Sequence, residues 1–264
     1  MRFCSLGSGS TGNATLVEAR KGSTTTRLLI DCGFSLRELQ ARLGRFGVAS
    51  DELDAVFVTH EHGDHVGCAL TMARRNGLIL WMSRGTWHAI GRPDLPREQL
   101  QFARDGQAIT IGDLQLMPYT VTHDAAEPLQ LRVSDGAAQL GVLTDAGSIT
   151  PHVIAALQGC DALLLECNHD RGMLAKSGYP ASVQARIGGR LGHLANDISA
   201  ELLAACDHDG LRHVVAAHLS ERNNSPELVR AALAGASKIA ADDIVVADPL
   251  RGFDWLDLQR QVWL

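Results

Sequence analysis

The feature that most constrains this chain is a dense run of metal-binding side-chain types directly after an apolar segment. Residues 55–58 read Ala-Val-Phe-Val, and the next seven, Thr59–His65, hold three histidines and two carboxylates. Neutral imidazole and carboxylate are the ligands that zinc and related first-row metals prefer. The spacing His-x-His-x-Asp-His supplies two pairs of ligands, which suits two adjacent metal ions better than one. A polar, solvated loop is the alternative interpretation.

Composition and charge indicate a globular protein without a membrane-spanning segment. Of the 264 residues, 45% are hydrophobic and 20% are charged. The six cysteines form no C-x-x-C pair, which is typical of reduced thiols, and neither a signal-like N-terminus nor a membrane-length apolar run is present. We therefore expect a cytoplasmic protein with no membrane partner. The formal charge of −6 argues against a broad basic surface, so a nucleic-acid partner would have to meet a local patch.

Turn-forming residues divide the chain into alternating strands and helices within a single domain, residues 1–264. Strands are expected at 26–31, 55–59, 78–82, 114–121, 129–134, 139–144, 162–166, 213–217 and 244–247, and helices at 36–46, 65–76, 151–158, 181–191, 198–206 and 226–236. Expected helix boundaries are Gly77 after one helix, Ser225 with Pro226 before another, and Asn196 with Asp197 before a third. Hairpin-like strands mixed with β-α units predict sheets covered by helices.

One glycine-rich motif looks like a nucleotide site and is not interpreted as one. Gly7–Gly12 fits G-x-G-x-x-G, and Asp31 follows at about the distance that the dinucleotide fingerprint requires. That fingerprint needs a helix to begin at the third glycine, so that its N-terminus can hold a pyrophosphate. Residues 13–19 instead read as a strand, closed by Gly22. We expect a glycine-rich hairpin beside a catalytic cleft.

Further ligand types stand at the ends of apolar strands. His123 follows one such run, Asp145 ends the run 140–144, and His218 ends the run 214–217. Strand ends along one edge of a sheet are where open α/β proteins assemble their sites. Each residue alone could be structural, but together with Thr59–His65 they indicate one centre. The remaining histidines lack this context and are expected to be surface or locally bonded: His88, His152, His169, His208 and His213.

The order of these residues resembles the metallo-β-lactamase-fold hydrolases over essentially the whole chain. Within that superfamily the chain is most similar to the YycJ/WalJ-like branch. The segments that carry this likeness are Ser5–Asn13, His123–Pro128, Glu166–Asp170, Gly192–Asn196 and Ala217–Asn224. The resemblance implies an α/β protein with an αββα sandwich, in which two mixed sheets pack face to face, helices lie outside and metals bind at one edge.

The resemblance also implies a ligand set for two divalent cations, Zn²⁺ or Mn²⁺. His60, His62 and His123 would hold one metal, and Asp64, His65 and His218 would hold the other, with Asp145 bridging and Asp31 orienting a ligand histidine. Two such cations lower the pKa of a shared water, so the expected nucleophile is a bridging hydroxide. Asp64 and Asp145 would offset part of the metal charge and so allow product release.

A second pair of residues bears on the substrate. In phosphodiesterase branches of the family, an extra histidine on a Gly-His turn lies near the scissile phosphate and is oriented by a glutamate. Here these would be His193 and Glu166. An imidazolium there stabilises developing charge on phosphoryl oxygens or protonates the leaving alkoxide. The alternative is that His193 only caps the helix expected near Ile198.

Competing activities of the fold agree less well with the sequence. Metallo-β-lactamases generally lack the histidine found at His65, and flavo-diiron oxidoreductases replace the one at His62 by glutamate. The residues after His123 differ from the glycine-rich turn of glyoxalase-type thioesterases. About seventy residues separate Asp145 from His218, too few for the inserted β-CASP domain.

The favoured function is therefore a phosphodiesterase or exonuclease-like nuclease that acts on nucleic-acid ends. A hydrolase of a small phosphodiester or thioester is the main alternative, and a metal-bound binding module without turnover is another. Four cations between Glu166 and His193 could track phosphates, although they could equally form a solvated helix face: Arg171, Lys176, Arg186 and Arg190.

Overall fold

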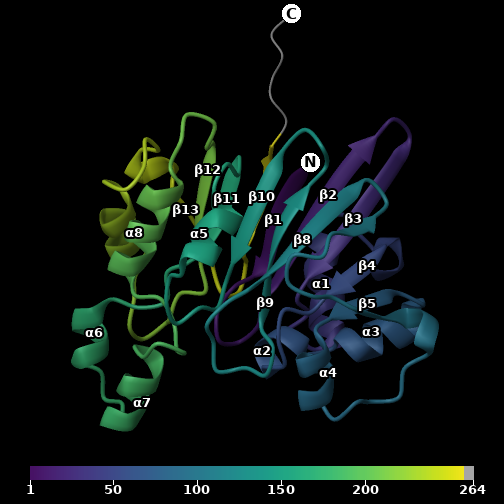
Figure 1. Ribbon diagram of the computed structural model, residues 1–264, viewed down its shortest axis with the longest axis horizontal. Coiled ribbons are helices and arrows are strands. Elements are labelled where there is room, and N and C mark those ends of the chain that lie inside the picture. Colours follow the sequence, from purple (N-terminus) through teal and green to yellow (C-terminus); the bar gives the residue numbers. More distant parts are fainter. Residues whose placement is uncertain (259–264) are drawn as a thin grey trace, which may run out of the picture.

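The computed structural model describes residues 1–258, and in it two seven-stranded sheets pack face to face with helices on their outer surfaces (Figure 1). The first sheet has the order β14-β1-β2-β3-β4-β5-β6, and the second has the order β13-β12-β11-β10-β9-β8-β7. The expected αββα sandwich is confirmed. Residues 259–264, which the predicted single domain includes, lie outside the described residues.

The strands and helices have the following bounds. The first sheet contains β1 Arg2–Gly7, β2 Ala14–Lys21, β3 Thr24–Ile30, β4 Ala55–Phe57, β5 Ile79–Met82, β6 Leu100–Phe102 and β14 Phe253–Asp257. The second contains β7 Ile109–Ile111, β8 Leu114–Thr120, β9 Leu129–Ser134, β10 Gln139–Leu143, β11 Ala162–Glu166, β12 His213–Ala217 and β13 Val245–Val246. The helices are α1 Leu36–Arg45, α2 Gly63–Val66, α3 Ala69–Asn76, α4 Arg84–Ala89, α5 Pro151–Leu157, α6 Arg171–Ala175, α7 Ala181–Ile187, α8 Asn196–Cys206 and α9 Pro226–Leu233. Within residues 1–258, none is long and apolar enough to span a bilayer.

Both sheets are mixed, and their parallel parts bring several strand ends to one edge. In the first sheet, β14, β1, β2 and β3 pair antiparallel, whereas β3, β4, β5 and β6 pair parallel. In the second, β10, β11, β12 and β13 pair parallel. Because parallel strands end on the same side, the residues that follow them come together.

Side chains alternate between a core shared by the two sheets and a core beneath each helical layer. On β3, Leu28 and Ile30 enter the shared core, while Leu29 packs toward α1 and α3. On β11, Leu164 enters the shared core, while Leu163 and its neighbours along the outer face pack beneath α5, α8 and α9. Successive side chains of a strand point to opposite faces, and here both faces are buried. This explains the continuous apolar runs in the sequence.

Two predicted helices are shorter or more broken than expected. The helix expected at 65–76 is interrupted at Gly67, whose φ is 28° and whose added Cβ would lie 2.3 Å from the Cys32 carbonyl oxygen. This close approach ends α2 and starts α3 in a new direction. The helix expected at 181–191 ends at Ile187 because Gly188 and Gly189 follow.

Two of the three predicted helix boundaries are confirmed and one is wrong. Gly77 ends α3 in the left-handed region, with φ 67°, and the Ser225 side chain accepts from the backbone of Leu228 to cap α9, so both predictions are confirmed. Asn196 is already helical and Ala195 occupies the cap position, so that prediction is wrong. Beyond the glycine-rich turn β2 begins, not a helix, which confirms the exclusion of a dinucleotide fold.

A buried carboxylate on β2 holds three strands of the first sheet together. Glu18 has a fully buried side chain, and its oxygens lie 2.7 Å from Arg2, 2.8 Å from Arg20 and 2.9 Å from Arg27. Burial opposes ionisation of Glu18, but the guanidinium groups, led by that of Arg27, outweigh it and lower the pKa of the carboxyl group. The arginines reach Glu18 from β1, β2 and β3.

Replacing Glu18 by Gln should lower the free energy of unfolding by about 2–3 kcal/mol, because it leaves the guanidinium groups without their counter-charge. The stability gained from the lowered pKa of Glu18 is present at neutral pH and is lost as the pH falls through that pKa. The difference in free energy of unfolding between the wild-type protein and Glu18→Gln should therefore be smaller in acid. Urea unfolding at pH 7 and pH 3 measures this. Glu201→Gln, on the exposed face of α8, is the matched control, and equal losses would contradict the prediction.

Candidate metal centre

The predicted site residues meet at one edge of the sandwich, where strands of both sheets end. Asp31 follows β3, the run 59–65 follows β4, Asp145 follows β10 and His218 follows β12. This edge lies beside α2 in the lower part of Figure 1. Asp31 and His218 have φ values of 62° and 55°, a left-handed conformation that non-glycine residues rarely adopt. Such strain collects at functional sites, where the surrounding structure enforces it.

Three imidazoles form a first group of ligand atoms. His60 Nε2 lies 3.1 Å from His62 Nδ1, and His123 Nε2 lies 3.3 Å from the same atom. His123 Nδ1 donates to the Gly192 carbonyl oxygen at 3.0 Å, which leaves the lone pair of Nε2 facing the other two rings. Three ring nitrogens that converge on one point can hold a divalent cation through their lone pairs.

A carboxylate and two imidazoles form a second group. Asp64 Oδ2 lies 3.6 Å from both His65 Nε2 and His218 Nε2. The two rings are almost fully buried, whereas about a quarter of the Asp64 side chain is exposed. The second group therefore opens to solvent on the side of Asp64.

Asp145 lies between the two groups. Its Oδ2 is 2.9 Å from His65 Nε2, and its Oδ1 is 3.3 Å from His218 Nδ1 and 3.8 Å from His123 Nε2. The side chain is 2% exposed. This is the position that a ligand bridging two cations would occupy.

Two buried atoms among the described residues indicate that cations belong here. His65 Nδ1 donates to Asp31 at 2.7 Å, so in the neutral ring its Nε2 would carry a lone pair facing Asp145 Oδ2 at 2.9 Å. Within residues 1–258, neither Asp145 Oδ2 nor His218 Nε2 has a hydrogen-bond partner. Two acceptors at this distance repel each other unless a proton or cation lies between them. The donor set therefore fits a pair of divalent cations.

Asp31 orients a histidine in each group. Its carboxylate accepts from His65 Nδ1 directly, and it accepts from Thr59 Oγ1 at 2.9 and 3.0 Å. Thr59 Oγ1 in turn lies 3.0 Å from His60 Nδ1. With its own proton donated to Asp31, the hydroxyl can accept the His60 Nδ1 proton, which turns the Nε2 lone pair of His60 toward the first group.

The same carboxylates set the charges of the histidines. Burial disfavours the charged ring, but Asp145 and Asp31 outweigh it and raise the pKa of His65 to about 10. For His218, burial is again outweighed by Asp145, and its pKa rises to about 10. Burial and the neighbouring imidazole of His65 instead hold the pKa of His60 well below its ordinary value. Cation binding must therefore displace protons from the second group.

The second predicted pair, Glu166 and His193, adjoins both groups. Glu166 is fully buried, and its Oε1 accepts from His193 Nδ1 at 2.7 Å and from His218 Nδ1 at 3.1 Å. His193 Nδ1 also lies 3.3 Å from Asp145 Oδ1. Burial is outweighed by Glu166, which raises the pKa of His193 to about 10. His193 does not cap α8, because Ala195 occupies that position and no side chain bonds the helix end.

Sequence reasoning assigned no role to two residues of the glycine-rich turn that support the second group. Asn13 Nδ2 lies 3.1 Å from His65 Nε2 and 3.4 Å from Asp64 Oδ2. Ser8 Oγ accepts from the backbone of His218 at 2.9 Å. The hairpin expected beside the cleft thus contacts the site directly. The sequence feature that could have indicated this contact is the glycine-rich run Gly7–Gly12 followed directly by the amide side chain of Asn13.

Most of the histidines set aside earlier have local structural partners. His152 pairs with Asp105, His208 and His213 bond to backbone carbonyl oxygens, and His88 contacts Arg92. His169 differs, because it is 1% exposed and, within residues 1–258, its Nδ1 has no partner. The expectation of a surface or locally bonded ring is therefore wrong for the side chain of His169.

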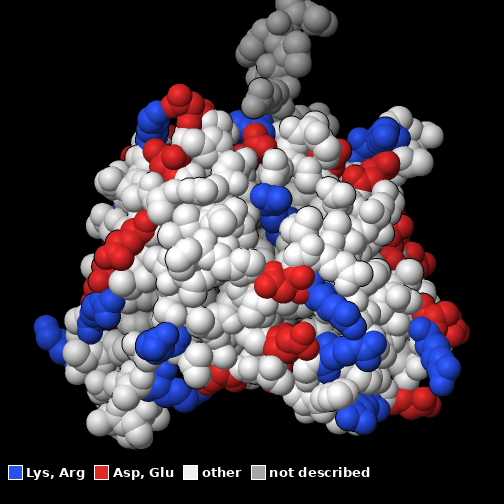
Figure 2. Space-filling model, in the orientation of Figure 1, with Lys and Arg blue, Asp and Glu red and all other residues white. Residues whose placement is uncertain are grey.

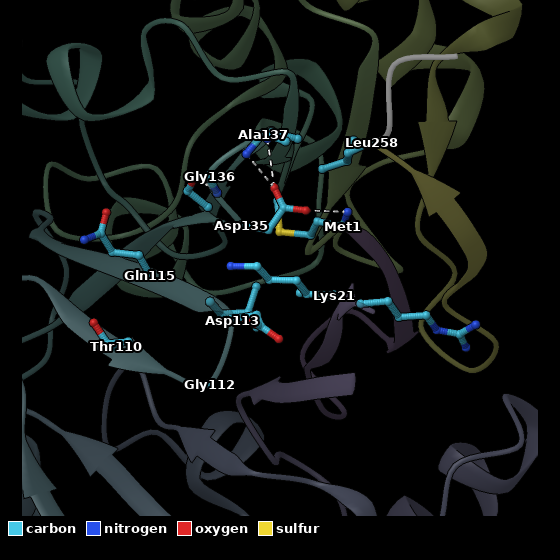
Figure 3. Close-up of a pocket in the computed structure, with 15 residues that line it drawn as sticks. Met1, Lys21, Thr110, Gly112, Asp113, Gln115, Asp135, Gly136, Ala137 and Leu258 are labelled. Carbon is cyan, nitrogen blue, oxygen red and sulfur yellow. Dashed lines mark hydrogen bonds and ion pairs between the residues drawn. The ribbon is translucent and has the colours of Figure 1, made fainter. Parts of the chain in front are cut away.

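The cavity of about 770 Å³ shown in Figure 3 is separate from this centre. It lies beside the N-terminus, at the end of the sandwich away from α2. The most central acid there, Asp135, accepts from the amino group of Met1 at 2.7 Å and from the backbone of Ala137 and Ala138. The carboxylate is already satisfied, so this cavity has no reactive group comparable to those of the metal centre.

The protein should bind two equivalents of divalent cation. His60→Ala should empty the first group and His218→Ala the second, each leaving about one equivalent, because each removes one of few strong ligands. Metal content after dialysis, measured by inductively coupled plasma mass spectrometry, tests this. His88→Ala is the control, because that ring is exposed and contacts Arg92 rather than any proposed ligand. Full metal content in both variants would refute the assignment.

Asp31→Asn should weaken binding at both groups by about 10- to 100-fold, because one carboxylate orients a histidine in each. Thr59→Val should weaken the first group more than the second, since it interrupts only the path to His60. Competition with a chelating indicator measures both affinities. A loss confined to the second group in Asp31→Asn would show that the hydroxyl relay has no effect.

Comparison with known proteins shows the family of this chain. The family model described as "Beta-lactamase superfamily domain" matches residues 26–219. The chain is similar to exodeoxyribonuclease YycJ of Bacillus anthracis, with 33% identity over 87% of this chain and 86% of that protein. It is 29% identical to exodeoxyribonuclease WalJ of Streptococcus pneumoniae, over 96% and 93% of the two chains. The metallo-beta-lactamase fold protein YhfI of Bacillus subtilis superposes with a TM-score of 0.73 at 16% identity, covering 97% and 99% of the two chains. The chain therefore belongs to the beta-lactamase superfamily, in the branch that includes YycJ and WalJ.

Proposed function

We propose that this protein is a metal-dependent phosphodiesterase that cleaves nucleic acid from its ends, in the manner of an exonuclease. The observation that carries the proposal is His193, which Glu166 holds at 2.7 Å while Asp145 lies 3.3 Å away. Two relatives with about 30% identity over most of the chain are named exodeoxyribonucleases, which supports DNA as the substrate.

His193 is the residue that suits phosphodiester chemistry. Its Nδ1 proton is used by Glu166, and among residues 1–258 its Nε2 has no hydrogen-bond partner. About a fifth of the side chain is exposed, so the ring can meet a substrate. A charged imidazole there can donate to a phosphoryl oxygen or protonate the departing alkoxide. Glu166 holds the ring in that orientation.

The proposed metal ligands are His60, His62 and His123 for one cation, and Asp64, His65 and His218 for the other, with Asp145 shared. A set of five imidazoles and two carboxylates suits Zn²⁺ or Mn²⁺. When bound, such cations would supply Lewis-acid activation and bring the pKa of a water molecule near neutrality. Asp64, the more exposed carboxylate, would offset part of the cation charge at the open side, and we assign it a catalytic role with His193 and Glu166.

A cytoplasmic location is part of the proposal. All six cysteines are free and buried, and Cys32 and Cys68 remain unbonded with their Sγ atoms 3.4 Å apart. Cysteines that are buried and form no C-x-x-C pair are typical of proteins in a reducing compartment.

His193→Ala should lower turnover of DNA ends by about 10²- to 10⁴-fold, because general-acid assistance is lost. Turnover of bis-p-nitrophenyl phosphate should fall less, since its leaving group departs without a proton. Metal content should stay unchanged. Steady-state kinetics on both substrates with Mn²⁺ or Zn²⁺, together with metal analysis, measure these effects.

His152→Ala is the control, because that histidine is half-exposed and bonded only to Asp105. Loss of metal in His193→Ala would make the residue a ligand or a structural element. If the wild-type protein cleaves neither phosphodiester but hydrolyses S-lactoylglutathione, the proposed function is wrong and a thioesterase replaces it.

A further inference from the structure

The segment that joins β11 to α8 concentrates positive charge beside the metal centre. Residues 171–196 contain four cations and no acidic residue, in a chain whose formal charge is −6. The cations are Arg171, Lys176, Arg186 and Arg190, and all four are exposed. In Figure 2, blue side chains gather at the lower left, over α6 and α7, and the lower edge of the molecule is hollowed between these helices and α4. We call residues 171–190 the basic arm.

The end of the basic arm is fixed to the centre. The backbone of His193 donates to the carbonyl oxygen of Ile187 at 2.8 Å, which folds the turn after α7 tightly back on itself. The Gly192 carbonyl oxygen in that turn accepts from His123 Nδ1 at 3.0 Å. An added Cβ on Gly192 would lie 2.2 Å from the Ile187 oxygen, so the turn requires glycine. The arm therefore presents its charges at a defined place relative to the ligand histidines.

Arg186 has an ion pair with a carboxylate that lies beside two ligand histidines. Its Nη1 is 3.3 Å from Asp124 Oδ2, and Asp124 Oδ1 is 3.4 Å from His123 Nε2 and 3.8 Å from His62 Nε2. A single carboxylate thus separates the guanidinium from the first group. The Arg186 side chain is 66% exposed, and an exposed pair of this kind contributes only about 0–1 kcal/mol. The guanidinium is therefore free to exchange Asp124 for a phosphate, to which it can donate two parallel hydrogen bonds.

Of the other three cations of the basic arm, one has an ion pair and two have none among residues 1–258. Arg171 Nε donates to both oxygens of Asp197, at 2.8 and 2.9 Å, so it has two contacts with a carboxylate where Arg186 has one. Lys176 and Arg190 form no ion pair with any residue in the range 1–258. Three cations spread along an arm match a ligand with several phosphates rather than a single anion.

Resting on the proposed nuclease function, we infer that the basic arm binds the phosphate backbone of the nucleic-acid strand being degraded, through Arg186, Arg190 and Lys176. The cations position the strand so that its end reaches His193. They carry no base contacts, so the binding is independent of sequence. Affinity for long substrates should therefore depend on the arm and on ionic strength.

The test compares the wild-type protein with the double variant Arg186→Gln/Arg190→Gln. The double variant should raise KM for a DNA oligonucleotide by about 10-fold or more, because two charge-assisted contacts are lost. The slope of log kcat/KM against log salt concentration should become shallower by about two, roughly one for each contact. Fluorescence anisotropy with a labelled oligonucleotide that carries phosphorothioate linkages measures binding by the metal-loaded protein with little turnover.

Arg20→Gln is the matched control, since Arg20 is also an exposed arginine paired with a carboxylate but lies on β2. It should leave KM and the salt slope unchanged. If the wild-type protein cleaves DNA and the double variant has the same KM and the same salt slope, the inference is overturned. The proposed function would then still stand. Competition by polyglutamate as strong as by DNA would also overturn it, in favour of an acidic protein partner. A wild-type protein that cleaves no phosphodiester would instead overturn the proposed function.

Discussion

The buried carboxylate of Asp31 is the contact on which the geometry of the centre depends. It follows β3 in a left-handed conformation, with φ 62°, that turns the side chain toward β4. There it accepts from the backbone and hydroxyl of Thr59 and from His65 Nδ1. One residue thereby ties two parallel strands together and orients histidines in both groups. The strain of its backbone is offset by hydrogen bonds to a fully buried charge, which are stronger than those between neutral groups.

The centre also brings several carboxylates together in a buried place, where their negative charges need positive partners. Asp145 and Glu166 are buried within reach of the same histidines, and both have a pKa below the ordinary value because those rings outweigh the effect of burial. Isolated buried carboxylates would be costly, so either protons on the rings or cations among them must supply the balance. This requirement links metal binding to folding, because a ligand that binds only the native state stabilises it.

The sequence was informative where function depends on residues that lie close together in the chain or follow an apolar strand. Thr59–His65 and the strand-terminal residues Asp145 and His218 could be found this way, because parallel strands deliver their ends to one edge. Contacts between distant segments could not. Asn13 reaches His65 only because the first hairpin folds over the loop after β4, and no periodicity reports that packing.

Local propensity failed for similar reasons. The break at Gly67 depends on the backbone of Cys32 lying against it, a contact made across the fold. The short helices α4 and α6 and the strand β14 escaped prediction because five or six residues give too few turns or alternations for a periodic signal. β14 belongs to the first sheet only through pairing with β1, which is remote in sequence.

The turn at Gly192 and His193 joins the basic arm to the proposed metal centre. Its carbonyl oxygen orients His123 in the first group, while its imidazole is held by Glu166 beside the second. Glu166 uses one oxygen for His193 and His218, and the other for the backbone of Leu194 in the same segment. Strand ends thus carry the proposed ligands, and in our proposal a surface segment meets the substrate. Changes on the exposed face of that segment can alter substrate preference while the ligand geometry stays intact, because its exposed cations Lys176, Arg186 and Arg190 are not among the proposed ligands.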